Sequence, residues 1–194
     1  MADSEEIMGG MCVDSLKVTS SSNEPIPEIC GQNSGQHIYV DMDRGCSGNT
    51  QLDFSFSGTA SIRIFEIKAS QIECGSRSAP PDGCLQYHTE LDGRFQTFNY
   101  AAKDESHLDD QKYYSICIRQ MLGYCCIQYS DLRRLVIRDH RQQFIQNTVV
   151  TNCSAPFEVR IFTNEISDVN NGLETKNTKV SKGLCFEYIQ MPCQ

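Results

Sequence analysis

The sequence predicts an all-β fold in which short strands pack as a sandwich or a barrel, and three observations lead to this prediction. Short segments alternate apolar and polar residues with a period of two, as strands with one buried face do. Clusters of Gly, Pro, Asn, Asp and Ser separate these segments. Long stretches with helical periodicity are absent. Short strands at such spacing are typical of sandwiches and barrels.

The first predicted strands lie between residues 52 and 67. Apolar residues occupy every second position in residues 52–56 and again in residues 62–64, and the phase of this alternation changes after residue 64. Such a change indicates a β-bulge or a second covered face. The apolar residues in order are Leu52, Phe54, Phe56, Ile62, Ile64, Phe65 and Ile67.

Three further strands are predicted in the second half of the chain. Residues 114–119 and residues 157–161 alternate in the same way. Residues 132–138 could form a helical turn, but the β-branched residues Val136 and Ile137 at their centre favour a strand.

Length and charge exclude several classes of protein. The chain has 194 residues, enough for one large or two modest domains with a hydrophobic core. Its formal net charge of −8 argues against binding to nucleic acid or to an anionic lipid surface. No apolar run reaches the roughly 18 residues that a membrane-spanning helix needs.

The 11 cysteines indicate an oxidising compartment, because cytosolic proteins rarely carry so many. The first residues, Met1 to Glu6, are acidic and do not resemble a signal peptide. We therefore expect the sequence to be a fragment of an exported protein. An intracellular metal–thiolate protein and a faulty gene model are the alternatives. The odd cysteine count favours a fragment, because truncation can separate a half-cystine from its partner.

A short internal repeat indicates two modules. Residues 71–74 are similar to residues 190–193, and residues 14–18 are similar to residues 131–135. Both offsets indicate a module of about 115–120 residues. The serine- and proline-rich residues 76–81 have the composition of a linker, so the boundary is expected beside them.

The second half of the chain carries cysteine, glycine and aromatic residues in a recurring order. The main stretches are Gly83-Cys84-Leu85-Gln86-Tyr87-His88-Thr89, Gly93-Arg94-Phe95-Gln96-Thr97-Phe98-Asn99-Tyr100 and Tyr114-Ser115-Ile116-Cys117-Ile118-Arg119. His107-Leu108, Gln111 and Gly123-Tyr124-Cys125 continue the pattern. These residues resemble the start of a CUB domain, and more narrowly the secreted CUB-domain proteins of arthropods. Residues 30–41 are similar to the middle of a preceding CUB domain, whereas residues 132–151 match poorly and look shortened.

The resemblance implies an antiparallel jelly-roll β-sandwich outside the cell. It implies that residues 1–74 are the C-terminal part of a first CUB-like module. Residues 75–194 would then form a second module that is nearly complete but shortened. By the family's pattern, the expected disulfides join Cys12 to Cys30 and Cys84 to Cys117.

The pairing of the other seven cysteines stays open. Cys125 and Cys126 are adjacent, so on a strand their side chains point to opposite faces and need separate partners. Candidates for these partners are Cys153, Cys185 and Cys193, and Cys46 and Cys74 are unassigned.

Neither zinc nor calcium is expected, and no cofactor is predicted. Cys84 and His88 could begin a zinc site, but the Cys-x2-Cys pairs of such sites are absent. Many CUB domains bind Ca²⁺, and the resemblance makes Asp14 and Asp131 the candidate ligands. The later loop of the family's site corresponds here to residues 56–59, which contain no carboxylate. One carboxylate is too few for a hard cation that prefers several oxygen ligands.

Other polar and aromatic residues have simpler predicted roles. Asn152 opens the glycosylation sequon Asn152-Cys153-Ser154, although cysteine in the middle position makes a poor acceptor. His37 and His88 are expected to be hydrogen-bonded structural residues. Tyr39, Tyr87 and Tyr100 are expected to anchor the sandwich.

No motif for catalysis or phosphate binding is present. The resemblance therefore implies a non-enzymatic extracellular recognition module that binds proteins or glycans through its sandwich loops. An accessory region of a secreted serine protease and a structural component of extracellular matrix or cuticle are the alternatives.

Overall fold

The protein is all β in the part of the chain that the structure describes. The computed structural model describes residues 12–22, 25–42, 48–59, 62–100, 112–131, 137–138, 144–145, 149–163 and 183–193. These residues contain strands, turns and extended segments, and they include no helix long and apolar enough to cross a membrane.

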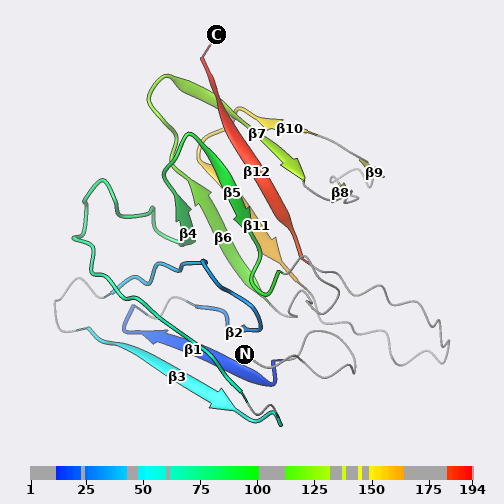
Figure 1. Cartoon of the computed structure of the whole chain (residues 1–194). Coiled ribbons are helices and arrows are strands. Elements are labelled where there is room, and N and C mark those ends of the chain that lie inside the picture. Colours follow the sequence, from blue (N-terminus) through cyan, green and yellow to red (C-terminus); the bar gives the residue numbers. More distant parts are fainter. Residues whose placement is uncertain are drawn as a thin grey trace.

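The described strands form four sheets (Figure 1). The first sheet has the order β2 (Ile29–Cys30), β1 (Asp14–Ser20) and β3 (Thr50–Phe56). A four-stranded sheet has the order β10 (Val150–Asn152), β7 (Tyr124–Asp131), β12 (Cys185–Pro192) and β5 (Asp92–Gln96). A three-stranded sheet contains β11 (Phe157–Phe162), β6 (Tyr113–Ile118) and β4 (Cys84–His88). The short strands β8 (Ile137–Arg138) and β9 (Phe144–Ile145) pair with each other.

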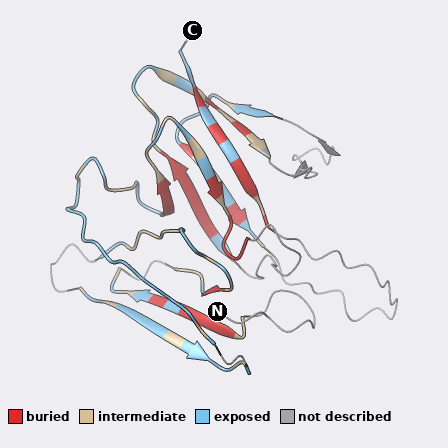
Figure 2. Cartoon of the chain, viewed as in Figure 1, coloured by how far each residue is buried: buried red, intermediate tan, exposed pale blue. Residues whose placement is uncertain are grey.

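The four-stranded and three-stranded sheets form a sandwich with a hydrophobic core between them. Figure 1 shows β5, β12 and β7 in one layer, with β4, β6 and β11 in the layer behind them. Strand β12 shows why the sheets pack together: Phe186 and Tyr188 on one face are buried, while Glu187 and Ile189 on the other face are exposed. The facing sheet contributes fully buried residues such as Ile116. Figure 2 shows that the buried residues lie mainly on the strands of these two sheets.

One strand pair of the sandwich departs from the antiparallel arrangement that the resemblance implies. Strand β4 pairs with β6 in parallel, with Tyr87 opposite Cys117 and His88 opposite Ile118. Every other strand pair in the described residues is antiparallel. Strand β4 therefore begins the sandwich as an edge strand beside β6 rather than as one arm of a hairpin.

The alternation pattern located three strands correctly and one incorrectly. Strands β3, β6 and β11 confirm the predictions for residues 52–56, 114–119 and 157–161. The predicted strand at residues 62–67 is wrong, because residues 62–73 form no strand. Within residues 132–138, only Ile137–Arg138 is a strand in the described part, and residues 132–136 lie outside it.

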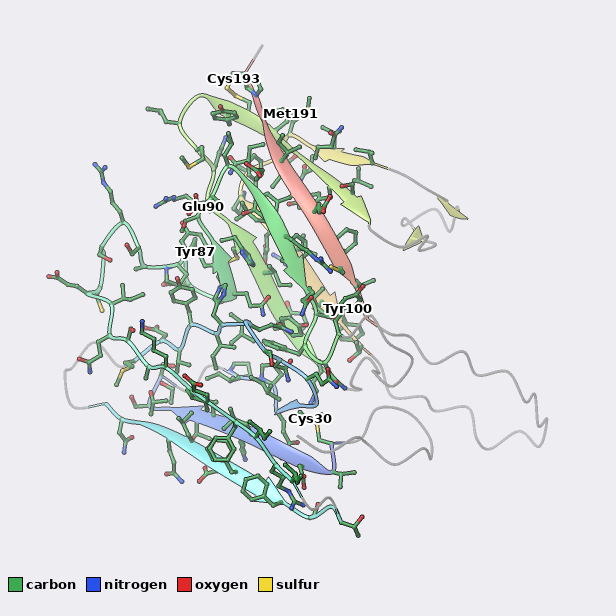
Figure 3. All side chains as sticks on the ribbon, in the orientation of Figure 1. Cys30, Tyr87, Glu90, Tyr100, Met191 and Cys193 are labelled. Carbon is green, nitrogen blue, oxygen red and sulfur yellow. A yellow bond between two sulfur atoms is a disulfide. The ribbon has the colours of Figure 1, made fainter. Side chains whose placement is uncertain are left out.

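Four disulfides join the described cysteines. The structure pairs Cys12 with Cys30 in the first segment and Cys84 with Cys117 between β4 and β6. The adjacent cysteines of β7 have separate partners: Cys125 pairs with Cys193, and Cys126 pairs with Cys153. Cys74 and Cys185 are unpaired, and Cys46 lies outside the described residues. Figure 3 shows Cys30 in the first sheet, at the end of β2, and Cys193 just beyond the end of β12.

The first segment packs against the sandwich through a shared core. Leu16, Val18 and Ile29 belong to the same cluster of buried residues as Leu85 and Phe95. The division into modules at residues 74 and 75 stays a prediction. The described part of residues 1–74 contains one sheet, whereas the described part of residues 75–194 contains both sheets of the sandwich.

Candidate functional site

A polar pocket lies between the loop of residues 34–37 and strands β4 and β5. Its volume is about 350 Å³. Amide, imidazole, hydroxyl and guanidinium groups supply most of its lining, and one aromatic residue supplies an apolar wall. The lining residues are Ser34, Gly35, Gln36, His37, Gln86, His88, Arg94, Phe95 and Gln96. This polarity is unusual, because most ligand pockets are predominantly apolar.

Two asparagines hold the loop against the end of β5. The Asn33 side chain donates to the Cys30 carbonyl oxygen at 2.7 Å and accepts from the Asn99 backbone N–H at 2.8 Å. Asn99 in turn accepts from the Gln32 backbone N–H at 3.0 Å through Oδ1. Asn99 has a φ of 56°, a left-handed conformation that asparagine tolerates better than most residues. The loop that forms one wall is thus tied to the sandwich by reciprocal hydrogen bonds.

A chain of amides orients the glutamines of the pocket. The buried Gln86 side chain donates to Gln36 Oε1 at 3.0 Å. Gln36 Nε2 donates to the Thr97 carbonyl oxygen at 3.2 Å. Because each amide is held by a neighbour, these side chains present a defined set of donors and acceptors.

His37 caps the free edge of β4. The Tyr39 backbone N–H donates to the Leu85 carbonyl oxygen at 2.8 Å. Two residues earlier, His37 Nε2 lies 3.1 Å from both the backbone nitrogen and the carbonyl oxygen of Tyr87. A neutral ring with its proton on Nδ1 accepts from the Tyr87 N–H, so the imidazole takes the place of a neighbouring strand's backbone. The prediction of a hydrogen-bonded structural residue agrees with this position.

His88 does not fit the same prediction. Its Nε2 is buried and has no hydrogen-bond partner among the described residues. Burial, and to a smaller extent the ring of His37 with its centroid 5.1 Å away, together lower the pKa of His88 to about 4. Burial also lowers the pKa of His37. Both imidazoles are therefore neutral at pH 7 and can act in the pocket as hydrogen-bonding groups without charge.

These pKa shifts predict loss of stability in acid. The unfolded chain binds protons on His88 near the ordinary pKa of 6.5, whereas the folded chain does so only near 4. The stability that the folded chain gains from neutral His88 is therefore complete above about pH 6.5. This part of the free energy of unfolding declines as the pH falls toward 4. His37 acts in the same direction. Chemical denaturation at several pH values should show this decline, and His88→Gln should flatten it. An unchanged slope in His88→Gln would contradict the assignment.

Arg94 is the cation of the pocket lining. Its Nε donates to the Sγ of the buried, unpaired Cys185 at 2.8 Å, and this hydrogen bond raises the pKa of Arg94. The bond restrains the side chain at the mouth of the pocket. A ligand rich in acceptor oxygens suits a site with this guanidinium and several amides.

Asp14, a candidate calcium ligand from the sequence, holds an arginine instead. Its carboxylate is buried and accepts from Arg63 Nε at 2.7 Å and from Arg63 Nη2 at 3.2 Å. The backbone N–H groups of Ser57 and Gly58 donate to the same carboxylate at 3.0 and 3.1 Å. The hydrogen bond from Arg63 is the main reason that the pKa of Asp14 falls to about 2. A guanidinium thus neutralises the carboxylate that a cation would need.

We predict that calcium does not stabilise this protein. Ca²⁺ at about 1 mM, where weak extracellular sites operate, should leave the Tm unchanged. Arg63→Gln should lower the Tm because it leaves the buried carboxylate of Asp14 without its charged partner. A calcium-dependent rise in Tm that Asp14→Ala removes would show that other residues complete a site.

The remaining candidates lie apart from the pocket. The backbone of Asp131 ends β7, and its side chain lies outside the described set. Asn152 ends β10, and its Oδ1 accepts from the Ser154 backbone N–H at 2.9 Å. Glycosylation of Asn152 stays a prediction. Within the described residues, no three His, Cys, Asp or Glu side chains gather as a metal site would require.

Sequence reasoning singled out both histidines of the pocket but missed its amides and Arg94. Gln36, Gln86 and Gln96 are common polar residues without a motif of their own. The sequence could have pointed to them only through their positions in or beside the CUB-like segments. The pocket itself forms because residues 34–37 fold against β4 and β5.

Comparison with known proteins gives one match. The family model described as Animal CUB domain matches residues 81–134, a span that contains the four strands from β4 to β7. This match supports a CUB-domain protein, and CUB domains are generally extracellular, non-catalytic modules of protein interaction. Searches of curated proteins and of solved structures found no significant match.

Proposed function

We propose that this chain is a non-enzymatic extracellular recognition module whose polar pocket binds a glycan carried by an extracellular partner. The observation behind this proposal is the lining of the pocket. Oriented amides, neutral imidazoles and a guanidinium suit the hydroxyl and carboxylate oxygens of a sugar better than an apolar peptide side chain.

An extracellular location is supported by the disulfides and by the family match. Disulfides persist in oxidising compartments, and four of them link the described strands and loops. The matched family is typically extracellular. The partner is therefore a secreted or cell-surface glycoprotein or a matrix glycan, and neither nucleic acid nor a membrane span is part of the proposal.

A glycan array probed with secreted protein tests the function. The pocket variants are Gln96→Ala, which removes one amide, and Ser34→Tyr, which places a ring at the exposed mouth. Gln96→Ala should weaken binding about tenfold, the loss expected when one or two polar contacts to a ligand are removed, and Ser34→Tyr should weaken it by obstructing entry. Thr151→Ala, at an exposed position of β10, is the matched control and should bind as the native chain does. No glycan bound, or binding that the pocket variants leave unchanged, would overturn the proposal.

A further inference from the structure

Strand β3 is a long edge strand without the usual protection. It lies at the end of the first sheet, with β1 on one side and no paired strand on the other among the described residues. Figure 1 shows β3 at the lower border of the molecule, and Figure 2 shows it largely exposed. Edge strands usually carry lysine, proline or a bulge that blocks pairing with another chain. The seven residues of β3 contain neither lysine nor proline, and Asp53 is their single charge.

One face of β3 is apolar and continues into an aromatic patch. Leu52, Phe54 and Phe56 lie on the same face, because each is directly opposite a β1 residue whose side chain points inward. Phe65 stacks on Phe54 with ring centroids 4.5 Å apart. Leu52, Phe56 and Phe65 are nevertheless 43%, 49% and 51% exposed. We call these four residues the aromatic patch. Exposed apolar patches beside an open sheet edge are typical of surfaces on which another chain docks.

The sequence of β3 is complementary to itself in one register. If two copies of β3 pair antiparallel with Phe54 opposite Phe54 of the second copy, Leu52 lies opposite Phe56 on both sides of the axis. The three apolar residues of each strand then face one another across the junction. On the other face, Asp53 lies opposite Ser55 of the second copy, so the two carboxylates avoid each other.

Neighbouring registers are less favourable. Centring the pair on Asp53 places the two carboxylates directly opposite each other, and like charges at that position destabilise a sheet. A shift by a single residue places each apolar side chain opposite a polar one. Within its own chain, Asp53 already has Lys17 opposite it on β1 and accepts from Gln51 Nε2 at 2.6 Å. The charge is thus compatible with the register centred on Phe54.

From these observations we propose that β3 is a homodimer interface. Two copies pair through their β3 edges about a two-fold axis at Phe54, which joins two three-stranded sheets into one continuous sheet of six. An isologous contact of this kind closes on itself, so it stops at two copies and leaves no further β3 edge for growth. The aromatic patches of the two copies lie on the same face of the joined sheet. The interface does not depend on the ligand of the polar pocket.

Charge substitutions at Ser55 test both the dimer and its register. Ser55 is exposed, so either substitution should leave the fold intact, which the Tm of each variant checks. Ser55→Asp places a carboxylate opposite Asp53 of the second copy at two symmetric positions. It should weaken dimerisation about tenfold in analytical ultracentrifugation at low salt. Ser55→Lys places an ammonium opposite the same carboxylates and should strengthen dimerisation several-fold.

The double variant Asp53→Lys with Ser55→Asp is the matched control. It restores opposite charges across the junction, so dimerisation should recover relative to Ser55→Asp alone, and its Tm reports the cost of the lysine that now faces Lys17 of the same chain. A native chain that stays monomeric across the whole concentration range would overturn the proposal. So would a chain that forms larger assemblies, or charge variants that shift the dimer in the same direction or not at all.

Discussion

Replacing Cys84 with serine should abolish secretion of the folded protein. The disulfide with Cys117 ties the first residue of β4 to the penultimate residue of β6, and Cys117 is buried. Strand β4 is an edge strand whose partner in the sheet is the parallel strand β6, and beyond that pairing its beginning is held by the hydrogen bond from the Tyr39 N–H to the Leu85 carbonyl oxygen. The bond spans 33 positions, for which the chain-entropy model gives a stabilisation of about 4 kcal/mol. Domains are stable by only about 5–15 kcal/mol in total.

Cys74 offers a matched control for this experiment. It is exposed and unpaired in the described part of the chain, so Cys74→Ser removes a sulfur without removing a described cross-link. With a secretion signal supplied, Cys74→Ser should be secreted at near-native yield, and Cys84→Ser should be retained or degraded. Secretion of both variants at equal yield, with the same urea midpoint, would show that the bond is dispensable.

Replacing Gly31 with alanine should unfold the junction between the first segment and the sandwich. Gly31 has a φ of 74°, and an alanine Cβ there would lie 1.8 Å from Asn99 Oδ1. The backbone strain costs about 1–2 kcal/mol. Relief of the overlap would displace Asn99 from its hydrogen bond with Gln32. We expect a total loss of about 3 kcal/mol or more in the free energy of unfolding, because strain and overpacking add.

Gly35 separates the two causes. Its φ is 76°, nearly that of Gly31, but an alanine Cβ at this position would have no described atom within 4 Å beyond its chain neighbours. Gly35→Ala should therefore show the backbone strain alone, about 1–2 kcal/mol. The double variant Gly31→Ala with Asn99→Gly should recover part of the loss, since glycine accepts the positive φ of residue 99 and removes the overlapping oxygen. Equal losses in Gly31→Ala and Gly35→Ala would rule out the Asn99 contact as the cause.

Local pattern predicted strands whose apolar residues recur at every second position, and in two of the three confirmed strands these residues lie in or against the core. Strand β11 is an example, since Phe157 and Ile161 are buried and the intervening Arg160 is exposed. The same reasoning was wrong at residues 62–67, which alternate like a strand but form none. There Arg63 reaches across to Asp14, and its guanidinium lies 5.3 Å from the Phe56 ring centre. In the described part of the chain these are side-chain contacts, and no strand pairs with the backbone of residues 62–67.

The sequence by itself determined the all-β class, the three strands β3, β6 and β11 and the need for separate partners of Cys125 and Cys126. These follow from a period-two backbone geometry that acts between neighbouring residues. Only the tertiary structure decided which strand borders which, how the pocket is lined and which polar groups are paired. Gln190 illustrates the reason, because its buried amide donates to the carbonyl oxygens of Glu90 and Arg119, far from it in sequence. A buried amide must be hydrogen-bonded, and its partners are residues that only the tertiary fold brings close to it. No local sequence pattern predicts which residues these are.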